Sequence, residues 1–295
     1  MNKAELKNIF YSLRPAQWIK NLFLFIPLIF GKKLLAYPAN IKTVLAFFIF
    51  CLAASVVYLI NDIIDIDKDK VHPTKRLRPI ALGKISIFKA SLSALILGVI
   101  SVSLSFALNL YFGVVVAAYL AGNILYSMAL KNVVIIDVFC IAVFFYLRIK
   151  AGSVIAMVDL SHWIIFMIIL LAFFLGINKR RQELKLLEKE SDTHRIVLNE
   201  YTPYFIDQMT SVITASIVIV YTLYTVDART TREFGSDHLI YSIPFVYYGI
   251  FRYLYMIHKV RNDGDPTRIL FSDQMMRINI ILWITVCIAV IYFGL

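Results

Sequence analysis

Four aspartates, Asp62, Asp65, Asp67 and Asp69, lie close together at the end of the uncharged apolar run 44–60. If this segment is helical, Asp62, Asp65 and Asp69 fall within roughly 60° of one another and Asp67 points nearly the opposite way. Three carboxylates on one face repel one another unless a cation lies among them. Hard oxygen ligands of this kind suit Mg2+, which also bridges to substrate phosphates. The cluster therefore predicts a magnesium site at the membrane edge, with a solvated helix end as the alternative.

Basic residues follow this cluster. Lys75, Arg76 and Arg78 lie within the next ten residues of the chain. Their side chains can hold phosphate oxygens, and arginine does so with a planar pair of donors. Together the acidic and basic residues predict a site for a phosphorylated substrate.

A second polar segment, Asn178 to Glu183, follows a later apolar run and contains Lys179 and Arg180. Lys179 and Glu183 are four residues apart and share one face of a helix. Glu183 is therefore either a ligand of a second magnesium ion or the partner of Lys179.

Further candidates lie at the ends of apolar runs or inside them: Gln17, Lys20, Tyr126, Lys131 and Arg148. Arg148 lies deep in its run, where a cation needs a partner or a polar cavity. Arg148 either binds a lipid phosphate or pairs with a buried carboxylate.

The composition predicts an all-α membrane protein that crosses the bilayer several times. The chain has 295 residues, of which 60% are hydrophobic and 17% charged. Apolar runs of about 18 or more residues are typical of transmembrane helices. We expect one domain, residues 1–295, with nine spans around a central cavity open to lipid. The spans are predicted at 20–37, 43–63, 86–106, 110–130, 133–156, 161–180, 211–228, 238–258 and 277–294.

The distribution of charge predicts the orientation in the inner or plasma membrane. With nine spans, one side holds most of the basic residues, and the other has only Lys32, Lys33, Lys42, Arg229 and Arg232. Because basic loops stay in the cytoplasm, we expect a cytoplasmic amino terminus, an external carboxyl terminus and a site facing the cytoplasm. The net charge of +11 then reflects anionic lipid and an anionic substrate rather than nucleic acid.

The motifs resemble those of a known family. The pattern Asn61-Asp62-x-x-Asp65-x-x-x-Asp69 resembles the first aspartate-rich motif of the UbiA-type intramembrane prenyltransferase superfamily. Within that superfamily, the segment from Leu13 to Asn21 resembles the opening of the decaprenyl-phosphate phosphoribosyltransferase branch. The second superfamily motif, Asp-x-x-x-Asp, is not obvious in this sequence, which argues against an ordinary prenyl diphosphate donor.

The resemblance implies an activity. The donor would be 5-phosphoribosyl 1-diphosphate, the acceptor polyprenyl phosphate and the metal Mg2+. The resemblance assigns Asp62, Asp65 and Asp69 to the metal. Donor phosphates would meet Lys75, Arg76 and Arg78, and the ribose 5-phosphate would meet Lys131, Lys179 and Arg180. Asn61 would fix a carboxylate or bind a ribose hydroxyl. The acceptor phosphate would meet Gln17, Lys20 and Arg148.

Two other readings remain open. In the first, the aspartates bind a prenyl diphosphate, and an aromatic acid or another acceptor is alkylated. In the second, the chain is a transporter or a non-catalytic membrane protein. A transporter more often has paired broken helices in matching halves, and the sequence has no such symmetry.

Overall fold

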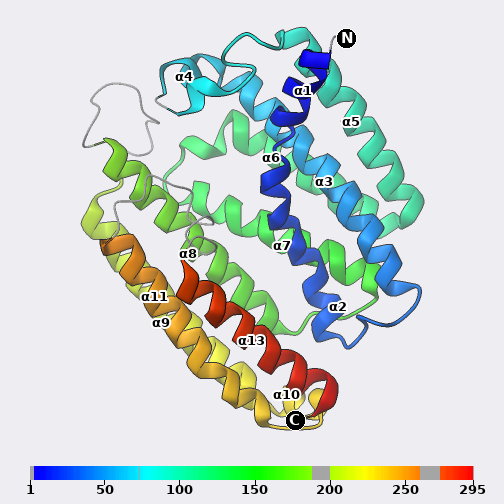
Figure 1. Ribbon diagram of the computed structural model, residues 1–295, viewed down its shortest axis with the longest axis vertical. Helices are drawn as coiled ribbons and strands as arrows, with labels where there is room; N and C mark the ends of the chain where they lie inside the picture. The colour runs from blue at the N-terminus through cyan, green and yellow to red at the C-terminus, as the bar shows by residue number, and fades with distance from the viewer. Residues whose placement is uncertain (1–2, 73, 188–199, 260–272, 295) are drawn as a thin grey trace. The chain divides into compact units, whose positions relative to one another are not determined.

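The computed structural model describes residues 3–72, 74–187, 200–259 and 273–294 (Figure 1). All regular elements in these ranges are helices, as the composition predicts. The described chain divides into two compact units, one up to Leu160 and the other from Ser161 onwards.

The first unit is built around the long helix α3, which packs against η1, α5, α6 and α7. Its core contains Phe50, Leu59 and Tyr119, all nearly inaccessible to solvent. Since α3 ends at the aspartates, its packing also places them. The elements of this unit are α1 (Lys3–Ser12), η1 (Pro15–Phe25), α2 (Ile26–Phe30), α3 (Ala39–Ile64), α4 (Ile66–Val71), η2 (Lys75–Leu77), α5 (Ile87–Leu108), α6 (Leu110–Met128), η3 (Leu130–Asn132) and α7 (Ile136–Ala156).

In the second unit α8 packs on α9, α9 packs on α11, and α11 packs on α13. A polar contact joins three parts of this unit: the hydroxyl of Tyr221 lies 2.6 Å from Ser242 Oγ and accepts a hydrogen bond from Trp283 Nε1 at 2.9 Å. The elements are α8 (His162–Leu187), α9 (Pro203–Val226), α10 (Ala228–Phe234), η5 (His238–Ser242), α11 (Ile243–Lys259) and α13 (Gln274–Phe293).

Seven of the described helices are long and apolar enough to cross a membrane: α3, α5, α6, α7, α8, α9 and α13. They correspond to seven of the nine predicted spans. Long apolar runs predict these helices well, because a helix buried in lipid needs only length and apolar side chains. Two boundaries differ by several residues, since α8 continues to Leu187 and α9 already begins at Pro203.

The other two predicted spans are not continuous α-helices, so the count of nine is not confirmed. Residues 20–37 form the end of a 3-10 helix, the short helix α2 and a turn, and residues 238–258 form η5 followed by α11. Proline gives a physical reason. Pro27 and Pro244 each occupy the second position of an α-helix, where the missing N–H is harmless. The same residues disfavour α-helix in the turn before them.

The 3-10 helix η1 approaches α7 very closely at Gly152. A Cβ atom added at Gly152 would lie 2.0 Å from the carbonyl oxygen of Leu24. No side chain fits in that space, so only glycine lets η1 lie directly on α7. This contact positions the segment that begins next to Arg14.

We therefore predict that Gly152→Ala lowers the free energy of unfolding by about 1–3 kcal/mol, the usual cost of overpacking. Gly98→Ala is the matched control, because its Cβ would lie 3.9 Å from the nearest atom, in Val56. At Gly98 the substitution should instead raise the free energy of unfolding, because alanine has a higher helix propensity than glycine. Thermal unfolding of the purified protein in detergent compares the two. Equal effects of both substitutions would contradict the close contact.

Candidate functional site

The aspartates lie across a break in the helix. The helix α3 ends at Ile64, Asp65 adopts φ −95° and ψ 11°, and α4 begins at Ile66. Asp62, Asp65 and Asp69 are 2%, 8% and 3% exposed, whereas the side chain of Asp67 is 89% exposed. The expectation that Asp67 points away from the other three aspartates agrees with these exposures. The expectation of one continuous helix is wrong, because the α-helix is interrupted at Asp65.

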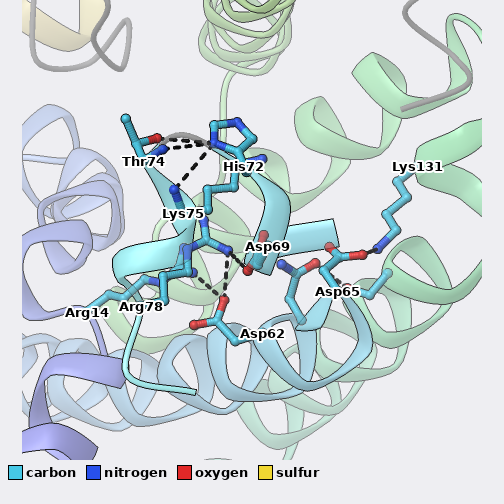
Figure 2. A network of polar contacts seen from close by, with 11 residues as sticks. Arg14, Asp62, Asp65, Asp69, His72, Thr74, Lys75, Arg78 and Lys131 are labelled. Atoms are coloured by element: carbon cyan, nitrogen blue, oxygen red, sulfur yellow. Dashed lines mark hydrogen bonds and ion pairs between the residues drawn. The ribbon is translucent and has the colours of Figure 1, made fainter. Parts of the chain in front are cut away.

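Arg78 bridges two of the three carboxylates. Its Nη1 atom lies 3.1 Å from Asp62 Oδ1 and also donates to Asp69 Oδ2 (Figure 2). A second guanidinium, that of Arg14, donates to the same oxygen of Asp62. Arg78 therefore contacts both carboxylates and Arg14 contacts Asp62. These ion pairs offset the cost of removing the charges from water.

Arg14 was not among the predicted site residues. It lies at the start of η1 with φ 53° and ψ 61°, a left-handed conformation that costs a non-glycine residue about 1 kcal/mol or more. Its guanidinium stacks over the ring of Tyr58, 5.1 Å from the centroid. Burial lowers the pKa of Arg14, although an arginine keeps its proton in proteins. The available signal was a cation directly before Pro15, where a helix is disfavoured.

The third carboxylate pairs with a lysine from a different part of the chain. Lys131 Nζ, from η3 between α6 and α7, lies 2.6 Å from Asp65 Oδ1, and both residues are buried. Next to this pair, Ser127 Oγ donates to Asn61 Oδ1 at 3.3 Å. Ser127 was not among the predicted site residues. These contacts tie the end of α3 to the end of α6 and to η3.

A tight turn returns the chain from α4 towards the aspartates. The Nδ1 atom of His72 accepts hydrogen bonds from the backbone N–H groups of Thr74 and Lys75, at 3.2 and 3.3 Å. Lys75 is half-buried and Arg76 is exposed. Of the three basic residues predicted here, Arg78 is the one whose guanidinium the structure brings onto the aspartates.

Arg148 lies within α7 and is held by neutral groups. It donates to Asn21 Oδ1 at 3.0 Å, to the carbonyl oxygen of Phe144 at 2.9 Å and to the hydroxyl of Tyr119 at 2.9 Å. Among the residues that the structure describes, it has no carboxylate partner, so the alternative in which Arg148 pairs with a buried carboxylate is wrong, and the alternative of a lipid phosphate stays a prediction. The contact with Asn21 instead joins η1 to α7.

The remaining candidates of the first unit have more local contacts. The N–H of Gln17 donates to the carbonyl oxygen of Arg14 at 2.8 Å, and Lys20 is half-buried in η1. Tyr126 packs edge-on against Phe144, with ring centroids 5.8 Å apart.

Within the second unit, Arg180 is fully buried and donates to Glu183. Arg181 donates to Asp207 Oδ1 at 2.7 Å and joins α8 to α9. Lys179 is exposed. The ion pair that the structure records for Glu183 is with Arg180, three residues before it, rather than with Lys179, four residues before it.

The donor chemistry of the aspartates fits a hard divalent cation, since all three offer carboxylate oxygens at a buried position. Their arrangement differs from the predicted one. In the described part of the chain, no three His, Cys, Asp or Glu side chains come close enough to hold a metal ion together. Arginine and lysine side chains neutralise the carboxylates instead.

Comparison with known proteins gives consistent matches. The sequence matches the UbiA prenyltransferase family over residues 24–272. A decaprenyl-phosphate phosphoribosyltransferase from Mycolicibacterium smegmatis is 33% identical, over 99% of this chain and 95% of that protein. One from Corynebacterium glutamicum is 31% identical, over 95% and 86%. The structure of a UbiA homolog from Archaeoglobus fulgidus bound to DMAPP and Mg2+ has a TM-score of 0.71 at 21% identity, and covers 96% of this chain and 99% of that one. The Archaeoglobus fulgidus homolog and this chain therefore have the same fold.

The pairing of Asp65 with Lys131 leads to a stability prediction. Lys131→Met leaves a buried carboxylate without its partner, which typically costs about 3–5 kcal/mol. Thermal unfolding in detergent measures the loss. The control is Lys70→Met, which removes an exposed partner of Asp67 3.2 Å away and should change stability by about 1 kcal/mol or less. Adding Asp65→Asn to Lys131→Met should recover part of the loss. If the added Asp65→Asn substitution restores no stability, this would contradict the coupling between Asp65 and Lys131.

Proposed function

Because the chain belongs to the UbiA prenyltransferase family, we propose that it transfers the 5-phosphoribosyl group from phosphoribosyl diphosphate to polyprenyl phosphate and releases pyrophosphate. The chain is a transferase and an integral membrane protein, as its family and its long apolar helices establish. The choice of donor and acceptor rests on one observation. The chain is similar, over nearly its whole length, to relatives named decaprenyl-phosphate phosphoribosyltransferase.

The charges of the site support this reaction. Breaking the bond between C1 and the leaving oxygen builds positive charge on the ribose and negative charge on pyrophosphate. In the proposal, Asp62, Asp65 and Asp69 would hold Mg2+, and the bound metal would neutralise the negative charge that develops on the leaving pyrophosphate. Glu183 is the proposed ligand of a second magnesium ion.

The ion pairs of the aspartates indicate how the donor would bind. Arg78 is bound to carboxylates and lies next to Lys75 and Arg76 in sequence. A diphosphate carries more negative charge than a carboxylate and accepts paired hydrogen bonds from a guanidinium. We infer that donor phosphates draw Arg78 and Arg14 away from Asp62, which frees carboxylate oxygens for the metal. Substrate and metal would then bind together.

The remaining residues are assigned by charge. The ribose 5-phosphate would be bound by Lys131, Lys179 and Arg180, and the ribose by Asn61 and Tyr126. The acceptor phosphate is already ionised at neutral pH, so the reaction needs no strong general base. The site is proposed to face the cytoplasm, with the amino terminus inside and the carboxyl terminus outside. The acceptor phosphate would be bound by Gln17, Lys20 and Arg148.

The test is pyrophosphate release by the purified protein. We expect release only when phosphoribosyl diphosphate, polyprenyl phosphate and magnesium are all present, and loss of release when a chelator removes the metal. If folded protein releases pyrophosphate from a prenyl diphosphate instead, the donor assignment is wrong and the chain is a prenyltransferase in the narrower sense. No release from either donor would contradict both readings.

In the same assay, Asp65→Asn should lower turnover by about a hundredfold or more, the scale of one strong electrostatic contact in a transition state. Asp67→Asn is the matched control, because it removes a neighbouring carboxylate whose side chain is 89% exposed, and it should leave turnover nearly unchanged. Thermal unfolding of each variant checks that it is folded. Near-normal turnover of a folded Asp65→Asn variant would refute the role of this aspartate.

A further inference from the structure

A basic hollow of about 860 Å³ lies beside the amino-terminal helix, between α1 and the segment from η2 to α5. Each side of the hollow contributes one lysine, α1 adds polar groups, and the other segment adds aliphatic groups. The lining residues are Lys7, Asn8, Tyr11, Leu77, Pro79 and Lys84.

The two lysines are not neutralised. Both are exposed, and neither side chain forms an ion pair or a hydrogen bond within the part of the chain that the structure describes. Lys7 Nζ lies 5.9 Å from the ring centroid of Tyr11. Among the residues that the structure describes, no acidic residue lines the hollow. The nearby acid Glu5 accepts from Lys89 at 2.6 Å. The hollow therefore presents two ammonium groups, and an anion would be attracted to them.

These charges are separate from those of the aspartate cluster. Arg14 and Arg78 lie within a few residues of the lining residues Tyr11 and Pro79, but both donate to Asp62. Neither arginine lines the hollow. A ligand in the hollow would thus use cations that the proposed reaction does not use.

Exposed apolar side chains next to the hollow point to a lipid. Leu6 and Phe10, one turn apart on α1, are 54% and 55% exposed, and Leu77 in the lining is 68% exposed. Phe88, at the start of the apolar helix α5, is 76% exposed. A short helix with apolar residues on one side and lysine beside them is typical of the boundary between headgroups and acyl chains. A soluble phosphate ester would make no use of these side chains.

We propose that this hollow binds the phosphate of an anionic glycerophospholipid, whose acyl chains lie against Leu6 and Phe10. Lysine is a compact point charge with three donors and can bind a phosphate diester without a fixed geometry. Asn8 and the hydroxyl of Tyr11 add polar groups for the rest of the headgroup. The assignment does not depend on the proposed transfer reaction.

Native mass spectrometry of the detergent-purified full chain tests the proposal with phosphatidylglycerol and phosphatidylcholine of the same acyl chains. We expect preferential binding of phosphatidylglycerol. Each of Lys7→Gln and Lys84→Gln should weaken it about fivefold, the usual effect of one lysine near an anionic lipid surface. The double variant should combine the two losses, whereas Lys7→Arg with Lys84→Arg should keep the preference.

The matched control is Lys42→Gln with Lys150→Gln. It removes the same charge from two exposed lysines outside the hollow and should leave the preference unchanged. Unchanged binding of phosphatidylglycerol by folded Lys7→Gln and Lys84→Gln variants would overturn the proposal. It would also be overturned if these variants lost binding of phosphoribosyl diphosphate or polyprenyl phosphate but still bound phosphatidylglycerol. The hollow would then bind a substrate phosphate.

Discussion

Neutralisation of three buried carboxylates is the constraint on which the first unit depends. Asp62, Asp65 and Asp69 are almost inaccessible to solvent, and an unpaired charge at such positions costs several kcal/mol. The cations come from three separate segments: Arg14 before η1, Arg78 after η2, and Lys131 in η3. Each connection between the helices must therefore bring its cation to the end of α3, and this requirement determines where these connections run.

The backbone next to the site adopts less favourable conformations where it brings a cation to the carboxylates. Arg14 adopts a left-handed conformation at the start of η1, and η1 itself is a 3-10 helix, whose hydrogen bonds are poorer than those of an α-helix. Two contacts with α7 hold η1 in place: the close approach of Leu24 to Gly152 and the hydrogen bond from Arg148 to Asn21. Arg148 thereby links the membrane interior to the segment that carries Arg14.

In the proposed reaction, the same ion pairs would make the site responsive to phosphate. A carboxylate paired with a guanidinium is a weaker competitor for that guanidinium than a diphosphate of higher charge. In the proposed reaction, donor phosphates would take Arg14 and Arg78 from Asp62, and the aspartates would then have to come closer together to hold a metal ion, because in the described part of the chain no three acidic side chains lie close enough to do so. The break at Asp65 helps, because Asp62 and Asp69 belong to different helices, α3 and α4.

Local features of the sequence were sufficient to predict most of the long helices and the location of the acidic site. The apolar runs predicted nine spans, and seven of them are long helices, because length and hydrophobicity decide whether a helix suits a bilayer. The spacing of the aspartates predicted that Asp67 points away from the other three, which are buried. The interruption of the α-helix at Asp65 and the pairing of the charges were beyond such reasoning. Arg14 and Asp62 are 48 residues apart, and Lys131 and Asp65 are 66 residues apart. Which cation reaches which carboxylate depends on how the helices pack, and local periodicity contains no information about contacts over such separations.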